Sequence, residues 1–241
     1  MKLLIIRHAE PDYSIDSLTE KGWREAELLK QRLIKREIDF FYTSPLGRAK
    51  DTAKPTLEAL GKQTEICPWL REFDGVAINP DTGKETYAWD RTPEFISRNE
   101  DYFDRRTWAE TPFIKSGDVK EKYDAVCRGL DEILARHGYI HNGTYFSVKE
   151  ENRKTIALFC HFGVECVLLS HLLNISPMAL WQGFVALPSS VTELATEERE
   201  QGIASFRCSR FGDLSHLYAG NEEPSFYARF CENYSAFDER H

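Results

Sequence analysis

The sequence lacks the features of several large protein classes. No window approaches the ~18 consecutive apolar residues of a membrane span, and the apolar stretch at 3–6 is too short for the core of a signal peptide. There is also no long Lys/Arg run. The 241 residues contain 31 basic and 39 acidic side chains, a net charge of −8, which disfavours duplex nucleic acid and anionic membranes as partners. We therefore expect a cytoplasmic protein that binds neither nucleic acid nor membrane.

Motifs for metals and common cofactors are missing as well. The six cysteines form no C-x-x-C pair, so zinc ribbons and thioredoxin-like redox motifs are unsupported. Several cysteines sit in apolar runs, which suits buried free thiols in a reducing compartment. His137 and His141 are four apart, but Gly138 interrupts the helix between them and no carboxylate is placed with them, so we interpret them as a solvated helix end. We interpret His171 and His216 as structural, and we expect no metal and no cofactor.

The motifs of Cys-dependent phosphatases and of nucleotide-binding enzymes are also missing. A Cys-dependent phosphatase needs an Arg six positions after its Cys, and none of the cysteines has one; the residue six after Cys160 is Cys166. G-x-x-x-x-G-K-[ST] and G-x-G-x-x-G are both absent, so nucleoside-triphosphate and dinucleotide enzymes have no support.

What the sequence does contain is the alternation of an α/β protein. Hydrophobic residues make up 41 % of the chain, which is enough for a sizeable core. Buried apolar runs predict strands over 3–6, 38–42 and 155–160, with 64–66 as a further short strand. Helical spacing predicts helices over 19–35, 46–60 (kinked at Pro55), 118–137 and 163–173. Strands over 191–195 and 203–209 are expected at an antiparallel edge. We predict one domain over 1–241, a three-layer sandwich with a mainly parallel central sheet and helices on both faces.

Residues from about 75 to 117 differ from the rest. They contain three prolines, many charges and seven aromatic side chains without sustained periodicity. We interpret this stretch as an irregular or partly helical cap insertion. Its aromatic residues fit a substrate lid and a satellite core equally well, and they include Tyr87, Trp89, Phe95, Phe103 and Trp108.

Charged and nucleophilic side chains follow the ends of the predicted strands. Arg7 and His8 come directly after the first strand, Arg48 lies just beyond the second, and His161 directly follows the 155–160 strand. Ligands of parallel sheets bind beyond the carboxyl ends of the strands, so these side chains should converge. Two arginines, two histidines and nearby helix N-termini suit a phosphoryl group, because Arg forks bind phosphate oxygens and a neutral His can be a nucleophile.

Four ordered motifs resemble the histidine phosphatase (phosphoglycerate mutase-like) superfamily. Arg7-His8-Ala9 is similar to its R-H-G motif, and Leu18–Gly22 to its L-T-x-x-G helix start. The stretch 44–53 resembles S-x-L-x-R-A-x-x-T-A, and 161–169 resembles the late H-x-G motif with its helix. A G-D-L-S-H-L stretch at 212–217 is similar to an ending of some members. The resemblance covers roughly 3–75 and 155–217.

The resemblance implies a role for each of these residues. His8 would be the nucleophile that becomes phosphohistidine, and Arg7, Arg48 and His161 would cradle the phosphoryl group. The general acid commonly lies shortly after the third strand, where Glu72 fits best and Asp74 is the reserve.

Some positions depart from the family pattern. Ala9 replaces the usual Gly, and Cys166 stands where many members have Arg, so no substrate role transfers there. Ser14 stands where many members carry a phosphate-binding Asn, and Phe162 stands where Gly is common. We assign Ser14 and Phe162, together with Arg7 and Arg48, to substrate binding.

The expected function is a metal-independent phosphomonoester hydrolase that works through phosphohistidine on His8 and acts on a small phosphorylated metabolite. The alternative is a phosphoglycerate mutase-type phosphoryl transfer, for which the insertion offers four acceptor-binding arginines, Arg91, Arg98, Arg105 and Arg106. A non-enzymatic alternative is an interaction module on an inactive phosphatase scaffold. The intact set of Arg7, His8, Arg48 and His161 disfavours that alternative.

Overall fold

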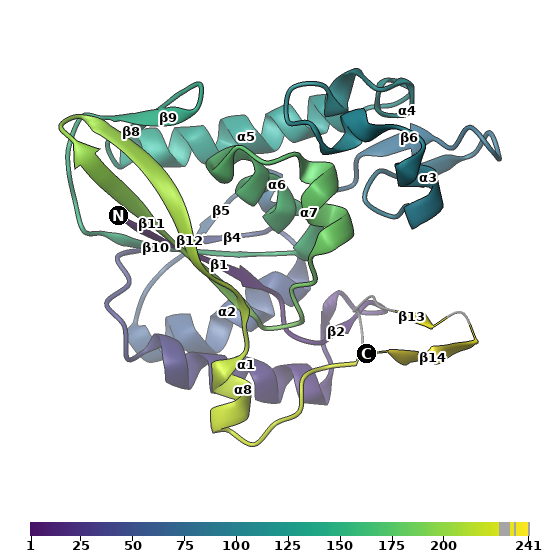
Figure 1. Ribbon diagram of the computed structural model, residues 1–241. Helices are drawn as coiled ribbons and strands as arrows, with labels where there is room; N and C mark the ends of the chain where they lie inside the picture. Colours follow the sequence, from purple (N-terminus) through teal and green to yellow (C-terminus); the bar gives the residue numbers. More distant parts are fainter. Residues whose placement is uncertain (227–231, 234, 241) are drawn as a thin grey trace.

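A mixed sheet forms the centre of the molecule in the computed structural model, which describes residues 1–226, 232–233 and 235–240 (Figure 1). Its strand order is β5-β4-β10-β1-β11-β12-β9-β8. The first four are parallel, and β11 then pairs antiparallel with β1. The parallel strands are β1 (Lys2–Arg7), β4 (Phe40–Thr43), β5 (Glu65–Ile66) and β10 (Thr155–Cys160), and the antiparallel strands are β8 (Tyr139–Asn142), β9 (Tyr145–Val148), β11 (Val191–Glu200) and β12 (Ile203–Asp213). The expected α/β fold with a parallel core is confirmed.

Helices cover both faces of this sheet. Figure 1 shows α1 (Glu20–Leu33) and α2 (Gly47–Leu60) below the sheet and α5 (Val119–Arg136) and α6 (Phe162–Leu173) above it. The side chains of β1 alternate between the two interfaces, as the period of a strand requires. Leu4 and Ile6 pack in the cluster with α1, whereas Leu3 and Ile5 belong to the larger cluster on the α5–α6 face.

The helix boundaries follow from local chemistry. Thr19 caps α1 by accepting a hydrogen bond from the Gly22 amide. Helix α2 continues past Pro55 and ends at Gly61, whose φ of +60° suits a residue without a side chain.

The segment 75–117 is built from short pieces. It contains β6 (Val76–Ile78), β7 (Glu85–Tyr87), α3 (Pro93–Ser97), α4 (Pro112–Lys115) and 3₁₀ turns over 100–103 and 108–110. It lies on the same side of the molecule as β2 (Pro11–Asp12), the short strand that follows β1 in the chain (Figure 1). Phe95 and Trp108 are buried in the main core, while Tyr87 and Phe103 are half exposed. The buried aromatic residues therefore extend the main core and do not form a separate satellite.

Several elements were not predicted from the sequence. Strands β8 and β9 form a hairpin around Asn142-Gly143. This hairpin occupies the sheet edge, so β11 and β12 are not the edge strands. Both are also longer than expected. Helix α7 (Pro177–Gly183) was also missed. The smaller elements are β2 (Pro11–Asp12), β3 (Ser17–Leu18), α8 (Ser215–Ala219), β13 (Glu232–Asn233) and β14 (Ala236–Arg240).

Five of the six cysteines lie in the described residues. Four cysteines, Cys67, Cys127, Cys160 and Cys166, are buried free thiols, and Cys208 is an exposed one. Cys231 lies outside the described residues. Within the described part of the chain, none of the helices has the length and apolar character that crossing a bilayer requires.

Helix α1 contains a carboxyl group that should make stability depend on pH. Glu25 has no exposed surface, and its Oε2 accepts a hydrogen bond from the Glu10 amide at 2.8 Å. Burial raises the pKa of Glu25 from 4.5 to about 8. The folded state thus binds this proton more tightly than the unfolded state does. Its contribution is complete below pH 4.5 and is lost as the pH rises from 4.5 through about 8.

Glu25→Gln should remove this pH dependence while keeping an acceptor for the Glu10 amide. Relative to the wild type, the variant should gain stability as the pH rises, by roughly 3–5 kcal/mol at pH 9, since each pKa unit corresponds to ~1.36 kcal/mol. Urea unfolding at pH 5, 7 and 9 measures the difference. Glu27→Gln, an exposed neighbour on the same helix, is the control and should show no such trend. An equal effect of Glu25→Gln at all three pH values would contradict the assignment.

Candidate active site

The backbone around Arg7 and His8 is fixed by two neighbouring segments. The His8 amide donates to the Cys160 carbonyl on the adjacent strand at 3.0 Å. The Arg7 amide donates to the Ser190 carbonyl, and the Ser189 amide donates to the His8 carbonyl at 3.0 Å. Ser189 has a φ of +61°, an uncommon conformation for a residue with a side chain. The 189–190 turn thus fixes the end of β1 through backbone hydrogen bonds.

His8 is oriented with one ring nitrogen available for chemistry. Its Nδ1 lies 2.8 Å from the Ala9 carbonyl oxygen. A carbonyl can only accept, so Nδ1 carries the proton and Nε2 carries the lone pair. Burial, together with the charges of Arg7 and Arg48, holds the pKa of His8 well below its usual value. The imidazole is therefore neutral, which a nitrogen nucleophile requires.

His161 faces His8 from the start of α6. The two ring centroids are 5.0 Å apart. Nε2 of His161 lies 2.8 Å from the Ser44 hydroxyl, which also accepts from the Leu46 amide. The hydroxyl still has its own proton to donate, and when it donates to Nε2 a neutral His161 carries its ring proton on Nδ1. Burial and the nearby cations lower the pKa of His161 well below its usual value. Nδ1 is buried and has no hydrogen-bond partner among the described residues, so it can donate to an incoming anion.

Arg48 is held in place by an aspartate that motif reasoning missed. Its Nη1 donates to Asp16 Oδ1 at 2.6 Å, and Asp16 Oδ2 accepts from the Gly47 amide. A side chain at position 47 would collide with the backbone of Asp16, because an added Cβ would lie 1.9 Å from the Asp16 carbonyl oxygen. Nε of Arg48 is buried without a partner in the described part of the chain. One edge of the guanidinium is thus oriented by protein and another is left for a ligand.

Glu72 lies against the first turn of α6. Its Oε1 accepts hydrogen bonds from the amides of Phe73 (2.7 Å) and Val164 (3.2 Å). Gly163 makes this approach possible, because a Cβ there would come within 2.6 Å of Glu72 Oε1. Burial raises the pKa of Glu72, against the opposing effect of the two amides and Arg7. Asp74 differs, since its side chain is 45 % exposed and pairs with Lys122 at 3.0 Å.

Known proteins place this arrangement in a family. A family model for the histidine phosphatase superfamily (branch 1) matches residues 3–209. The chain belongs to that superfamily. Two curated relatives from Hydrogenobacter thermophilus are similar to it. Putative phosphoserine phosphatase 2 is 35 % identical over 81 residues (30 % of this chain and 40 % of the relative), and phosphoserine phosphatase 1 is 29 % identical over 150 residues (57 % and 66 %). The matched region thus spans less than two thirds of either relative.

Solved structures of this superfamily share the fold at low sequence identity. A phosphoserine phosphatase from Entamoeba histolytica superposes with a TM-score of 0.59 at 20 % identity, covering 90 % of this chain and 98 % of the other. A mycobacterial glucosyl-3-phosphoglycerate phosphatase gives a TM-score of 0.58 at 20 % identity, covering 88 % and 98 %. These likenesses establish the histidine phosphatase fold.

The two remaining residues assigned to substrate binding occupy different environments. Phe162 is buried at the first position of α6, and the Arg7 guanidinium lies over its ring at 5.7 Å from the centroid. Phe162 thus packs against Arg7. Ser14 is exposed, and its hydroxyl donates to Asp12 at 2.5 Å. Its loop neighbours Tyr13 and Asp16 both contact Arg48, and the assignment of Ser14 to substrate binding stays a prediction.

The G-D-L-S-H-L motif at 212–217 contacts α1 and the 189–190 turn. Asp213 pairs with Arg32 of α1 at 2.9 Å. The buried His216 has its Nε2 3.1 Å from the hydroxyl of Ser189, the residue whose amide donates to the His8 carbonyl. The motif is therefore linked to the backbone of His8 through two hydrogen bonds.

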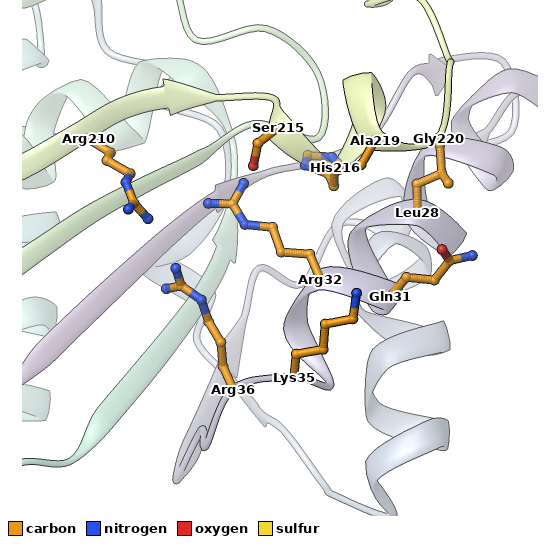
Figure 2. Close-up of a pocket in the computed structure, with 10 residues that line it drawn as sticks. All are labelled: Leu28, Gln31, Arg32, Lys35, Arg36, Arg210, Ser215, His216, Ala219 and Gly220. Carbon is orange, nitrogen blue, oxygen red and sulfur yellow. The ribbon is translucent and has the colours of Figure 1, made fainter.

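A basic cavity of about 530 Å³ lies beside this motif, between α1, β12 and α8 (Figure 2). Three of its arginines are in ion pairs. Arg32 pairs with Asp213, while Arg36 and Arg210 share Glu193 at 2.8 and 3.3 Å. The lining includes His216 but none of Arg7, His8, Arg48 or His161. The cavity is therefore separate from the candidate active site. Its three arginines share two carboxylates and Lys35 also lines it, so the cavity keeps an excess of positive charge.

Proposed function

We propose that this histidine phosphatase hydrolyses phosphomonoesters through a phosphohistidine on Nε2 of His8, without a metal ion in the reaction. The observation that carries the proposal is a neutral His8, whose Nδ1 proton is held by the Ala9 carbonyl, beside the buried Arg7 and His161 and the partly buried Arg48. The two guanidinium groups and the Nδ1 proton of His161 supply the positive potential that a phosphoryl group needs as it transfers.

The proposed reaction has two steps. The Nε2 lone pair of His8 attacks phosphorus while the bond from phosphorus to the ester oxygen breaks, and Glu72 gives its proton to that oxygen. Because Oε1 of Glu72 accepts two amide hydrogen bonds, the proton belongs on Oε2. Water then attacks the phosphohistidine, the N–P bond breaks, and Glu72 takes a proton from the water. His8 returns to its neutral form and inorganic phosphate leaves.

The segment 75–117 is the proposed cap of this one-domain enzyme, whose domain spans 1–241. Trp89 donates its indole N–H to the Phe73 carbonyl, next to Glu72, and its own carbonyl accepts from Gln182 of α7. These bonds tie the segment to the loop that carries Glu72 and to α7. We further propose that the substrate is a small phosphorylated metabolite of the class named for the relatives, such as phosphoserine, and that the enzyme is cytoplasmic, with neither nucleic acid nor membrane as partner.

The arginines of the cap favour hydrolysis over the mutase alternative. A mutase must hold a phosphorylated acceptor with extra basic groups. Arg98 is exposed and paired with Asp81 and Glu94, and Arg91 lies over the rings of Phe95 and Phe113. The guanidinium groups of Arg91 and Arg98 are thus engaged within the segment itself, and that of Arg105 donates to the Gly143 carbonyl, which leaves Arg106 as the arginine of the four to test for acceptor binding.

A phosphate-release assay over a panel of phosphomonoesters tests the proposal. Phosphoserine, 3-phosphoglycerate, sugar phosphates, nucleoside monophosphates and p-nitrophenyl phosphate should be compared with and without 2,3-bisphosphoglycerate, in excess chelator. We expect phosphate release from at least one small ester, inhibition by vanadate, and no requirement for a divalent ion. Isomerisation of phosphoglycerate that depends on the bisphosphate would identify a mutase, and no turnover on any ester would support the inactive scaffold.

A further inference from the structure

Three side chains with metal-binding atoms converge at the end of α6 opposite to the candidate active site. Asp131 comes from α5, His141 from β8 and His171 from the last turn of α6. Nε2 of His171 lies 2.8 Å from Asp131 Oδ1, and Nδ1 of His141 lies 3.8 Å from Asp131 Oδ2. The centroids of the two imidazole rings are 4.3 Å apart. One donor atom from each residue fits within a span of 4.8 Å.

We propose that Asp131, His141 and His171 form a binding site for a divalent transition-metal ion of the zinc class. Two imidazoles and a carboxylate are a donor set that zinc accepts, and three protein ligands leave a position for water. The side chains are 31 %, 24 % and 9 % exposed, so an ion can enter from solvent. A single acidic residue between two histidines also distinguishes the site from an ordinary patch of surface carboxylates.

The surroundings hold the three ligands in place before an ion binds. The ring of His141 packs against Phe146 across the β8–β9 hairpin, with centroids 5.2 Å apart. The turn of that hairpin is tied down by Arg105, which donates to the Gly143 carbonyl, and by Asn174, which donates to the Thr144 carbonyl at 3.1 Å. Because Asn174 directly follows α6, this bond keeps the hairpin next to His171. A bound ion would cross-link α5, β8 and α6.

The position of the site separates it from the proposed reaction. His161 precedes the first turn of α6, and His171 comes ten residues later, which is ~15 Å along a helix axis. The ion would therefore stabilise the helix that carries His161 without touching the phosphoryl group. Sequence spacing could not indicate this site, because Asp131 and His171 lie 10 and 30 positions from His141 along the chain.

Titration of the chelator-treated, full-length protein with Zn²⁺ tests the site. We expect one saturable equivalent by calorimetry and a higher thermal unfolding temperature with the ion bound. His141→Gln should weaken binding by at least about tenfold and remove most of the thermal shift. Asp131→Asn should do the same. Glu132→Gln, an exposed carboxylate next to Asp131 on α5, is the matched control and should bind like the wild type.

Substituting Co²⁺ separates this site from adventitious binding to the cysteines. Cobalt bound by His141, His171 and Asp131 should give visible d–d absorption without a thiolate-to-metal charge-transfer band. His171 is the most buried of the three, so His141→Gln is the decisive variant if His171→Gln does not fold. No saturable Zn²⁺ binding, unchanged binding in His141→Gln, or a thiolate band would each overturn the proposal.

Discussion

His8→Ala should reduce turnover to the level of a blank and should prevent covalent labelling by a ³²P-phosphomonoester. The reason is that the variant keeps Arg7, Arg48 and His161 but loses the nitrogen that forms the bond to phosphorus. Label on the wild type should survive a base quench and disappear in acid, because a phosphoramidate is labile to acid. The measurement is rapid-quench labelling followed by denaturing electrophoresis, with phosphate release measured in parallel.

His161→Asn provides the internal comparison for this experiment. It keeps the nucleophile and removes one proposed donor to the phosphoryl group, so labelling should be slower but still present. Near-UV circular dichroism should show that both variants keep the native packing. Acid-stable label on the wild type, or normal turnover in His8→Ala, would show that the phosphoryl group does not pass through His8.

The sequence was informative where function depends on residues that directly follow strands. Arg7-His8 and His161 could be placed because apolar runs of four to six residues have clear ends, and parallel strands bring such ends to one edge. The structure does bring His8 and His161 together, with ring centroids 5.0 Å apart. Thr155–Cys160 was predicted with its observed bounds, because a strand buried on both faces is apolar throughout.

Residues that position other residues through loop or backbone geometry could not be recognised from the sequence. Asp16, which holds Arg48, lies in a loop and looks like any solvated carboxylate in the sequence. The Ser189 amide donates to the His8 carbonyl from a positive-φ conformation, and a serine in a sequence does not indicate that conformation. The assignment of Ser14 rested on its position in a family pattern, and the sequence could not show that its hydroxyl donates to Asp12. The β8–β9 hairpin was missed because its strands are short and half exposed, with polar residues at their ends.

A second large effect on the rate is expected from replacing the general acid, which is Glu72 in the proposed reaction and Asp74 in the alternative. Glu72→Gln should slow transfer of phosphate from an alkyl ester by ~10²–10⁴, because the departing alkoxide then receives no proton. With p-nitrophenyl phosphate the loss should be small, since that leaving group departs without protonation. Single-turnover measurement of the phosphorylation step with both substrates tests this difference. Asp74→Asn is the matched control, and its ion pair with Lys122 on the surface predicts little dependence on the leaving group.

The pH dependence provides an independent check on the same residue. Burial raises the pKa of Glu72, so the acid keeps its proton to a higher pH than an ordinary carboxyl group does. With the wild type, phosphorylation by the alkyl ester should slow as the pH rises through that pKa, because only the protonated form can act. This limb should vanish in Glu72→Gln, which has no proton to lose, and persist in Asp74→Asn. If Asp74→Asn instead loses the limb and gains the leaving-group dependence, the acid is Asp74. That result would leave His8 and the arginines in their proposed roles, since these groups act on the phosphoryl group and not on the departing oxygen.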